Sequence, residues 1–148
     1  MIKGIIRPLV ICPFQNNNSI LVAEGFDPAS GAHYYRPIGG GIEFGERSSE
    51  ALVREVEEEI GAAINNIQFL GTIENIFTFN GDRGHEIVQV YNADFADQSF
   101  YSMESFEGKE DDGTIFKVLW KPLSEFEHGK LKLVPEELLE MLILSRGK

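Results

Sequence analysis

The apolar positions of the chain fall into several short runs that have the length and composition of β-strands. Turn residues such as Asn16-Asn17-Asn18 and Asn80-Gly81 separate neighbouring runs, as is typical of strands joined by tight turns. We therefore predict that the first two runs form one hairpin and that the third and fourth form another. The predicted strands are Ile5–Phe14, Ser19–Glu24, Ile67–Phe79, His85–Phe95 and Phe116–Trp120.

Two other segments have the pattern of helices. Between about Ser48 and Ile60, four apolar residues form one stripe at about 100° per residue, which predicts an amphipathic helix. Gly61 is the expected stop of this helix. Pro135 opens a strongly apolar segment that predicts a second helix to about Ser145. The stripe of the first helix consists of Leu52, Val53, Val56 and Ile60.

The acidic residues of the first helix separate into two groups. Glu55, Glu58 and Glu59 lie together beside the apolar stripe, whereas Glu50 and Glu57 lie on its other flank and are expected to be dispensable. Like charges three or four residues apart cost roughly 0.2–0.5 kcal/mol per pair. An acidic helix face is most often a solvated surface. Three carboxylates at the edge of the core also suit a hard divalent cation, which takes oxygen ligands.

A glycine-rich turn precedes this helix. Its glycines allow backbone angles that other residues avoid, and they let a phosphate or a metal ion approach closely. The whole pattern is Gly40, five residues, Glu46, seven residues, then Arg54-Glu55-Val56-x-Glu58-Glu59-x-Gly61-Ala62. It resembles the Nudix box, the signature of Mg-dependent pyrophosphohydrolases that act on nucleoside diphosphates linked to another group. Ile38 departs from the commonest form, in which a proline precedes the glycines.

The resemblance implies a fold for the whole chain. The resemblance is specific over the box. The rest of the chain resembles the family only in the order of its helices and strands and in its length. The implied architecture is the Nudix fold, an α/β/α sandwich around a mixed β-sheet, in one domain over residues 1–148. Strands on both sides of a central helix, followed by a terminal helix, agree with it.

The resemblance also implies roles for residues of the box. Mg²⁺, with Mn²⁺ as an alternative, would be held by the three carboxylates of one helix face and by a backbone carbonyl of the glycine turn. Arg54 would pair with Glu46 and hold the neighbouring glutamate in position. The implied metal ligands are Gly39, Glu55, Glu58 and Glu59.

Residues 99–113 are polar and acidic and predict a long loop. Many members of the family place another glutamate in a loop after the hairpin, as metal ligand or general base. Glu110 is the first choice here, because Gly108-Lys109-Glu110 resembles the MutT placement; Glu107 and Glu104 remain alternatives. For the general base, a glutamate of the box is a further alternative. A solvated acidic loop with no role in the site is the simpler interpretation of the same residues.

Residues near the glycine turn are candidates for contacts with the substrate. Arg36 could meet a phosphate, and Tyr35 or Phe77 could stack on a base. Most aromatic residues in such segments belong to the core. Glu86, at the start of a predicted strand, could point into the site, although an exposed polar position is the simpler expectation. Other aromatic candidates are Tyr34, Phe44 and Phe79.

The charge and composition narrow the choice of partners. Asp and Glu outnumber Lys and Arg by 24 to 13, and the net charge of −11 repels nucleic-acid backbones and anionic membranes. We therefore expect a small nucleotide whose phosphates meet the protein through a cation. The single cysteine, Cys12, excludes an internal disulfide, and without a signal-peptide pattern a cytoplasmic location is expected. The apolar residues 138–144 are expected in the core, but they could also build a homodimer.

The implied reaction is the hydrolysis of a pyrophosphate bond. A nucleoside or deoxynucleoside triphosphate, as in the MutT type, is the leading expectation for the substrate. ADP-ribose, nucleotide sugars and dinucleoside polyphosphates are alternatives. A catalytically silent domain that senses a nucleotide is a further alternative, but the chain keeps all the box acids that such a domain usually lacks.

Overall fold

The computed structural model describes residues 4–146, which form nine strands, three α-helices and one short 3-10 helix. The strands are β1 Ile6–Cys12, β2 Gln15–Asn16, β3 Ser19–Asp27, β4 Ala32–Arg36, β5 Ile38–Gly41, β6 Ile64–Phe79, β7 Asp82–Phe95, β8 Ser105–Lys109 and β9 Ile115–Pro122. The α-helices are α1 Ser48–Ile60, α2 Leu123–Glu127 and α3 Glu137–Arg146, and the 3-10 helix is Gln98–Tyr101.

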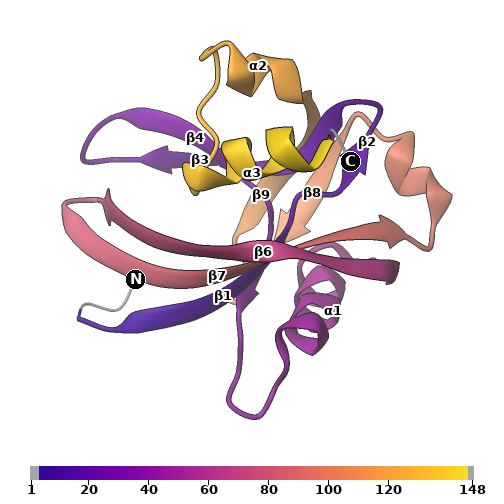
Figure 1. Ribbon diagram of the computed structural model, residues 1–148, viewed down its shortest axis with the longest axis horizontal. Helices are drawn as coiled ribbons and strands as arrows, with labels where there is room; N and C mark the ends of the chain where they lie inside the picture. Colours follow the sequence, from indigo (N-terminus) through magenta and orange to yellow (C-terminus); the bar gives the residue numbers. More distant parts are fainter. Residues whose placement is uncertain (1–3, 147–148) are drawn as a thin grey trace.

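The strands form two sheets that cross at the centre of the molecule (Figure 1). The first sheet has the order β5-β1-β7-β6. It is mixed, because β1 and β7 are parallel whereas the pairs β5–β1 and β7–β6 are antiparallel. The second is antiparallel, with the order β2-β3-β9-β8 and with β4 also paired to β3. The edge strand β5 of the first sheet carries the glycine turn.

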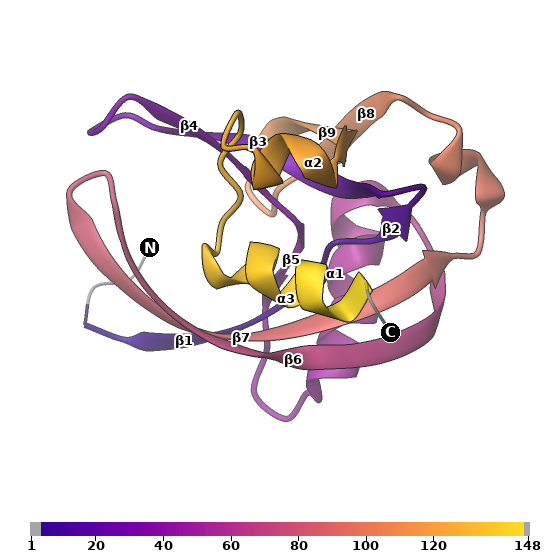
Figure 2. The same cartoon turned by 45° about the horizontal axis from the view of Figure 1, so that its top comes forward.

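Alternation along the central strands sends side chains into two separate cores. Val10 and Cys12 enter one cluster with Leu52 and Val56 of α1, whereas Ile11 enters the other, which contains residues of α2 and α3. The two groups of helices therefore cover opposite faces of the sheets (Figure 2). This confirms the predicted α/β/α sandwich, with two crossing sheets as its middle layer.

Helix α1 has the predicted bounds. Glu50 accepts a hydrogen bond of 2.9 Å from the backbone N–H of Arg47 at its start, so Glu50 caps the helix. At its end Gly61 takes a left-handed conformation, with φ 65°, and donates its N–H to the carbonyl of Glu57. Val53, predicted in the apolar stripe, is 44% exposed. That prediction is wrong because the buried face is turned toward Glu55 and Glu59.

The predicted hairpin between the first two strands is also wrong. β1 pairs with β5 and β7, and β3 pairs with β2, β4 and β9, so the two strands belong to different sheets. Phe14, with φ 40°, turns the chain after β1. The asparagine turn then joins only the two-residue strand β2 to β3. β3 also continues to Asp27, past its predicted end at Glu24.

Residues 99–113, predicted to be a loop, contain part of the 3-10 helix and the edge strand β8. β8 pairs with β9 in register Glu107↔Lys117, and most of its side chains are polar because it faces solvent. On β9, Trp120 donates its indole N–H to the carbonyl of Phe100 at 3.0 Å. Its ring stacks on Tyr101 with 5.8 Å between centroids.

The terminal helix α3 packs into the second core cluster. Leu138 and Leu142 are fully buried there, while Leu144 is exposed on the far side of the helix. Within residues 4–146, no helix is both long and apolar enough to cross a membrane.

Candidate functional site

The glycine strand β5 lies against β1 and α1, at the edge of the first sheet. Gly39 has φ 155°, and a side chain there would collide with the carbonyl of Val10. A Cβ on Gly40 would lie 2.5 Å from the carboxylate carbon of Glu55. The turn is therefore without side chains so that the Glu55 carboxylate can lie directly against the backbone.

Arg54 donates hydrogen bonds to four residues around this turn. Its Nε and Nη2 donate to the two carboxylate oxygens of Glu46 at 2.8 and 2.9 Å, a bidentate pair. Nη1 donates to Glu55 at 2.9 Å and to Glu58 at 3.2 Å, and Nη2 also reaches the carbonyl of Gly41 at 3.0 Å. The contact between Arg54 and Glu46 that the resemblance implied is thus present, and Arg54 fixes the box glutamates relative to the glycine turn.

The Arg54–Glu46 pair predicts how stability depends on pH. Hydrogen bonds from Arg54, with one from the Glu43 backbone, lower the pKa of Glu46 from 4.5 to about 2. The depressed pKa means that the stabilisation is fully present above about pH 4.5 and is lost as the pH falls toward 2. We expect Glu46→Gln to destabilise the protein more at pH 7 than at pH 3, as measured by urea unfolding. An equal difference at both pH values would contradict the pairing.

Burial separates the three acids of the box helix. Glu55 and Glu59 are each only 8% exposed, whereas the side chain of Glu58 is half-exposed beside Arg54. Loss of hydration raises the pKa of Glu59 to about 8, although Arg36 and a backbone hydrogen bond at Gly39 oppose the shift. The pKa of Glu55 is also raised by burial and lowered by Arg54. The site therefore contains negative charge that is costly without a cation.

The donor set fits a hard divalent cation. Within the described part of the chain, Oε1 of Glu59 is buried without a hydrogen-bond partner. The carboxylates of Glu55 and Glu110 are close enough to raise the pKa of Glu59, and carboxylate oxygens are among the ligands that Mg²⁺ and Mn²⁺ prefer. Among residues 4–146, no three His, Cys, Asp or Glu side chains are placed so that they could hold a metal ion by themselves. Mg²⁺ ordinarily takes one or two carboxylates and completes its shell with water and substrate phosphates.

Arg36 and Glu110, both predicted site residues, contact each other. Arg36 donates from Nη2 to Glu110 Oε1 at 2.9 Å, and its guanidinium lies 5.3 Å from the centre of the Phe116 ring. Both charges influence the pKa of Glu59, so the pair lies beside the box acids. Glu110 follows β8 in a tight turn, where its N–H donates to the carbonyl of Thr114 at 2.8 Å.

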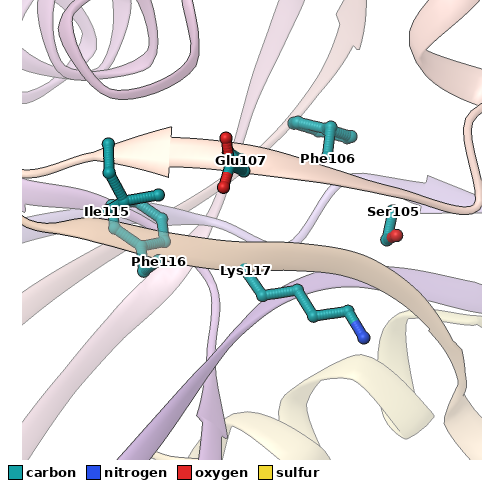
Figure 3. Close-up of a pocket in the computed structure, with 6 residues that line it drawn as sticks. All are labelled: Ser105, Phe106, Glu107, Ile115, Phe116 and Lys117. Carbon is teal, nitrogen blue, oxygen red and sulfur yellow. The ribbon is translucent and has the colours of Figure 1, made fainter.

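The alternatives Glu104 and Glu107 lie elsewhere. Glu107 points into an open groove of about 500 Å³ on the β8–β9 ribbon, and Figure 3 shows it on the strand beside the one that carries Lys117. The charge of Glu110 raises the pKa of Glu59, and that of Asp111 raises the pKa of Glu55, so these two residues lie near the box acids. Geometry therefore favours Glu110, and it adds Asp111, which the sequence did not single out.

The aromatic candidates are not gathered at the box. Tyr35 lies on the other side of β4 from Arg36, and its ring packs edge-on against Phe126 at 5.9 Å. Phe77 is half-buried on β6, opposite Gly84 of β7. Phe44 is fully exposed in the loop that follows the glycine turn. The structure thus brings none of these three rings into contact with the box acids.

Arg7 is a neighbour of the glycine turn that sequence reasoning missed. Its Nη2 lies 3.2 Å from the place where a Cβ of Gly41 would be, so the guanidinium covers the turn from the side of β1. A single arginine at the start of an apolar run carries no motif, and only the pairing of β1 with β5 reveals its position.

Comparison with known proteins identifies relatives of this chain. The family model described as NUDIX domain matches residues 6–142. The NAD-capped RNA hydrolase NudC of Vibrio atlanticus (strain LGP32) is 36% identical over 67 residues, which cover 45% of this chain and 24% of that protein. MutT4 of Mycobacterium tuberculosis (strain CDC 1551 / Oshkosh), a mutator protein by name, is 29% identical over 110 residues, which cover 70% of this chain and 41% of that protein. The chain therefore matches less than half the length of these curated relatives.

Solved structures show the same fold. A MutT NUDIX hydrolase from Burkholderia pseudomallei superposes with a TM-score of 0.59 at 24% identity, covering 82% of this chain and 86% of that one. A structure titled ADP compounds hydrolase superposes with a TM-score of 0.62 at 19% identity, covering 95% of this chain and 71% of that one.

Proposed function

The chain belongs to the NUDIX domain family, and on that premise we propose that it hydrolyses a pyrophosphate bond in a nucleoside diphosphate derivative with the help of a divalent cation. The observation that carries the proposal is the buried, unpaired oxygen of Glu59 beside Glu55 and the bare backbone of Gly40. A buried carboxylate oxygen without a partner is costly in a purely structural helix. It is useful where a cation completes its coordination.

The residues proposed to hold Mg²⁺ are Glu55, Glu58, Glu59 and the Gly39 carbonyl. Mg²⁺ supplies neutralisation of charge on the pyrophosphate oxygens and lowers the pKa of coordinated water. Arg54 positions the ligands, because its contacts with Glu46 and Gly41 anchor it while Nη1 holds Glu55 and Glu58. Because Glu46 and Gly41 anchor most of the guanidinium, Arg54 can lie among the ligands of a cation without displacing it.

Arg36 and Glu110 are proposed to act on the substrate and on the attacking water. Arg36 still has donors to offer beyond its contact with Glu110, and a guanidinium suits a phosphate group. Glu110 would accept a proton from the water that attacks phosphorus. When Arg36 turns to a phosphate, Glu110 loses its partner and becomes available as the base.

The proposed substrate is a nucleoside or deoxynucleoside triphosphate, as in the MutT type, with a nucleoside monophosphate as one product. A structure titled ADP compounds hydrolase has the same fold, and a derivative of ADP, such as ADP-ribose, is the second candidate. The net charge of −11 favours a small molecule over an RNA, although NudC is named for NAD-capped RNA. Phe77 remains a proposed contact of the base, whereas Tyr35 packs against Phe126 on the other side of β4 from Arg36. A homodimer remains a proposal.

A panel of substrates tests this function. Nucleoside triphosphates, ADP-ribose, nucleotide sugars, dinucleoside polyphosphates and NAD would be incubated with Mg²⁺, with Mn²⁺ and with a chelator, and the products would be separated by chromatography. We expect cation-dependent release of a nucleoside monophosphate from at least one class. Binding of a nucleotide without turnover of any member would instead indicate a sensing domain.

A further inference from the structure

A polar row interrupts the inner face of the first sheet next to the glycine turn. On this face, the cross-strand rows of β1, β7 and β6 are apolar where they enter the core shared with α2 and α3. The next row along the strands is polar on all three strands. The last apolar row is Leu9, Val88 and Ile73, and the row that follows is Arg7, Glu86 and Asn75. We call the second set the recognition row.

One end of the recognition row touches the box. The Arg7 guanidinium covers Gly41, 3.2 Å from where a Cβ would be, and Gly41 is adjacent to the glycine that contacts Glu55. Arg7 is the cross-strand partner of Glu86. Because Gly40 and Gly41 face opposite sides of β5, the row lies on the face of the sheet opposite α1. It leads away from the glycine turn across β1, β7 and β6.

Glu86 is the half-buried centre of the row. Its Oε1 accepts one hydrogen bond, from Asn75 Nδ2, at a long 3.3 Å. Burial raises the pKa of Glu86, and the Asn75 hydrogen bond and the Arg7 charge oppose the shift. A carboxylate can accept about four hydrogen bonds. Glu86 thus has acceptor capacity left in a place where water is partly excluded.

Beyond the row lie aromatic rings. Phe77 follows Asn75 on the same face of β6, opposite Gly84. Phe79, two residues further, meets the edge of Tyr34 from β4 at 6.3 Å, and the backbone N–H of Asn80 donates to Asp27 at 3.0 Å. These contacts join the two hairpin tips, so the recognition row lies between the glycine turn and the place where the hairpins touch.

We propose that the recognition row binds the nucleoside part of the substrate and selects a base whose Watson–Crick edge carries an amino group beside an unprotonated ring nitrogen, namely adenine or cytosine. This inference rests on the proposed function. Arg7 contacts the phosphate nearest the nucleoside, Glu86 accepts from the amino group, and Asn75 donates its second amide hydrogen to the ring nitrogen. Phe77 offers an apolar surface to the face of the base.

The pairing of Glu86 with Asn75 decides the base. The carboxylate is an acceptor, and the neighbouring amide nitrogen is a donor with one hydrogen still free. Adenine and cytosine present the complementary pair, an amino donor beside a nitrogen acceptor. Hypoxanthine and uracil have a carbonyl and an N–H at the same two places, so both contacts become mismatched. A site that pairs with polar groups of its substrate discriminates strongly against such analogues.

The test compares nucleotides that differ only at these positions. ATP would be compared with ITP, and CTP with UTP, in steady-state hydrolysis with Mg²⁺. We expect the wild-type protein to favour the amino-bearing member of each pair by about 10- to 100-fold in kcat/KM. Glu86→Leu is expected to reduce both ratios to about one, by lowering kcat/KM for ATP and CTP while leaving ITP and UTP within about threefold.

Glu74→Leu provides a matched control. Glu74 is adjacent to Asn75 on β6 but is exposed on the opposite face, where it pairs with Ile87. The same substitution there is expected to preserve both ratios. Arg7→Gln is expected to raise KM for all four nucleotides alike, because Arg7 contacts the phosphate. Circular dichroism melting of each variant would show that the fold is kept.

A binding measurement separates this inference from the proposed function. AMP and IMP, then CMP and UMP, would be titrated into chelator-treated protein and followed by NMR. Tighter binding of AMP and CMP, abolished by Glu86→Leu, would support the recognition row even if no substrate is hydrolysed. Equal binding within each pair, a preference for IMP and UMP, or the same effect of Glu86→Leu on all four would overturn it.

Discussion

Glu58→Gln is expected to keep the fold and to lower the hydrolysis rate by about 10²- to 10⁴-fold, the range for a positioned ligand or acid–base group. Glu58 is half-exposed and accepts from Arg54 Nη1 at 3.2 Å, so the fold depends little on its charge. The proposed catalysis depends on that charge, because Glu58 lies on the same side of α1 as Glu55 and Glu59. Steady-state kinetics with Mg²⁺ on the best substrate, together with a melting curve, would measure both effects.

Glu57→Gln is the matched control for this variant. Glu57 precedes Glu58 on the same helix, is exposed and points away from the glycine turn. The same loss of one charge there is expected to leave the rate within about twofold, since surface substitutions away from a site have small effects. If Glu58→Gln turned over substrate at nearly the rate of Glu57→Gln, Glu58 would no longer be a candidate for the metal site.

Gly40→Ala is expected to lower the rate by about 10²-fold through a shift of a single carboxylate, because displacements near 1 Å can have effects of this size. The added Cβ would lie 2.5 Å from the Glu55 carboxylate, which is the mobile end of its side chain and would move away. Gly40 does not have positive φ, so the backbone accepts alanine and the protein should remain folded. Activity and thermal melting of the purified variant would separate the two effects.

Gly81→Ala is the control with the opposite pattern. Gly81 lies in the β6–β7 turn with φ 82° and nothing within 4 Å of an added Cβ, so backbone strain should lower the melting temperature. Its activity below the melting transition is expected to stay near that of the wild type. A Gly40→Ala protein that is unstable but fully active when folded would show that Gly40 serves the fold rather than Glu55.

Sequence reasoning succeeded where structure depends on neighbours along the chain. The bounds of α1 were predictable because Glu50 and Gly61 act within one turn of the helix ends. The Arg54–Glu46 pair spans eight residues, and the box pattern was enough to imply it. These contacts could be predicted because the spacing of residues along a helix determines which side chains lie next to each other.

Contacts between distant segments were beyond the reach of that reasoning. β1 pairs in parallel with β7, so the adjacent run β3 could not be its partner, and no local signal marks such a pairing. Arg36 and Glu110 are 74 residues apart and meet only because β4 and the β8–β9 turn belong to the same sheet. β8 itself was missed because an edge strand rich in polar residues lacks the apolar run that marks a central strand.

The position of Trp120 makes its intrinsic fluorescence a probe of this part of the protein. Trp120 is the only tryptophan of the chain, and it lies on β9, the strand that β8 and the Glu110 turn are paired with. Its indole is held by Phe100 and Tyr101, so its emission responds to displacement of the β8–β9 ribbon. If a nucleotide separates Glu110 from Arg36, as proposed, stopped-flow fluorescence of the unlabelled protein would follow that step.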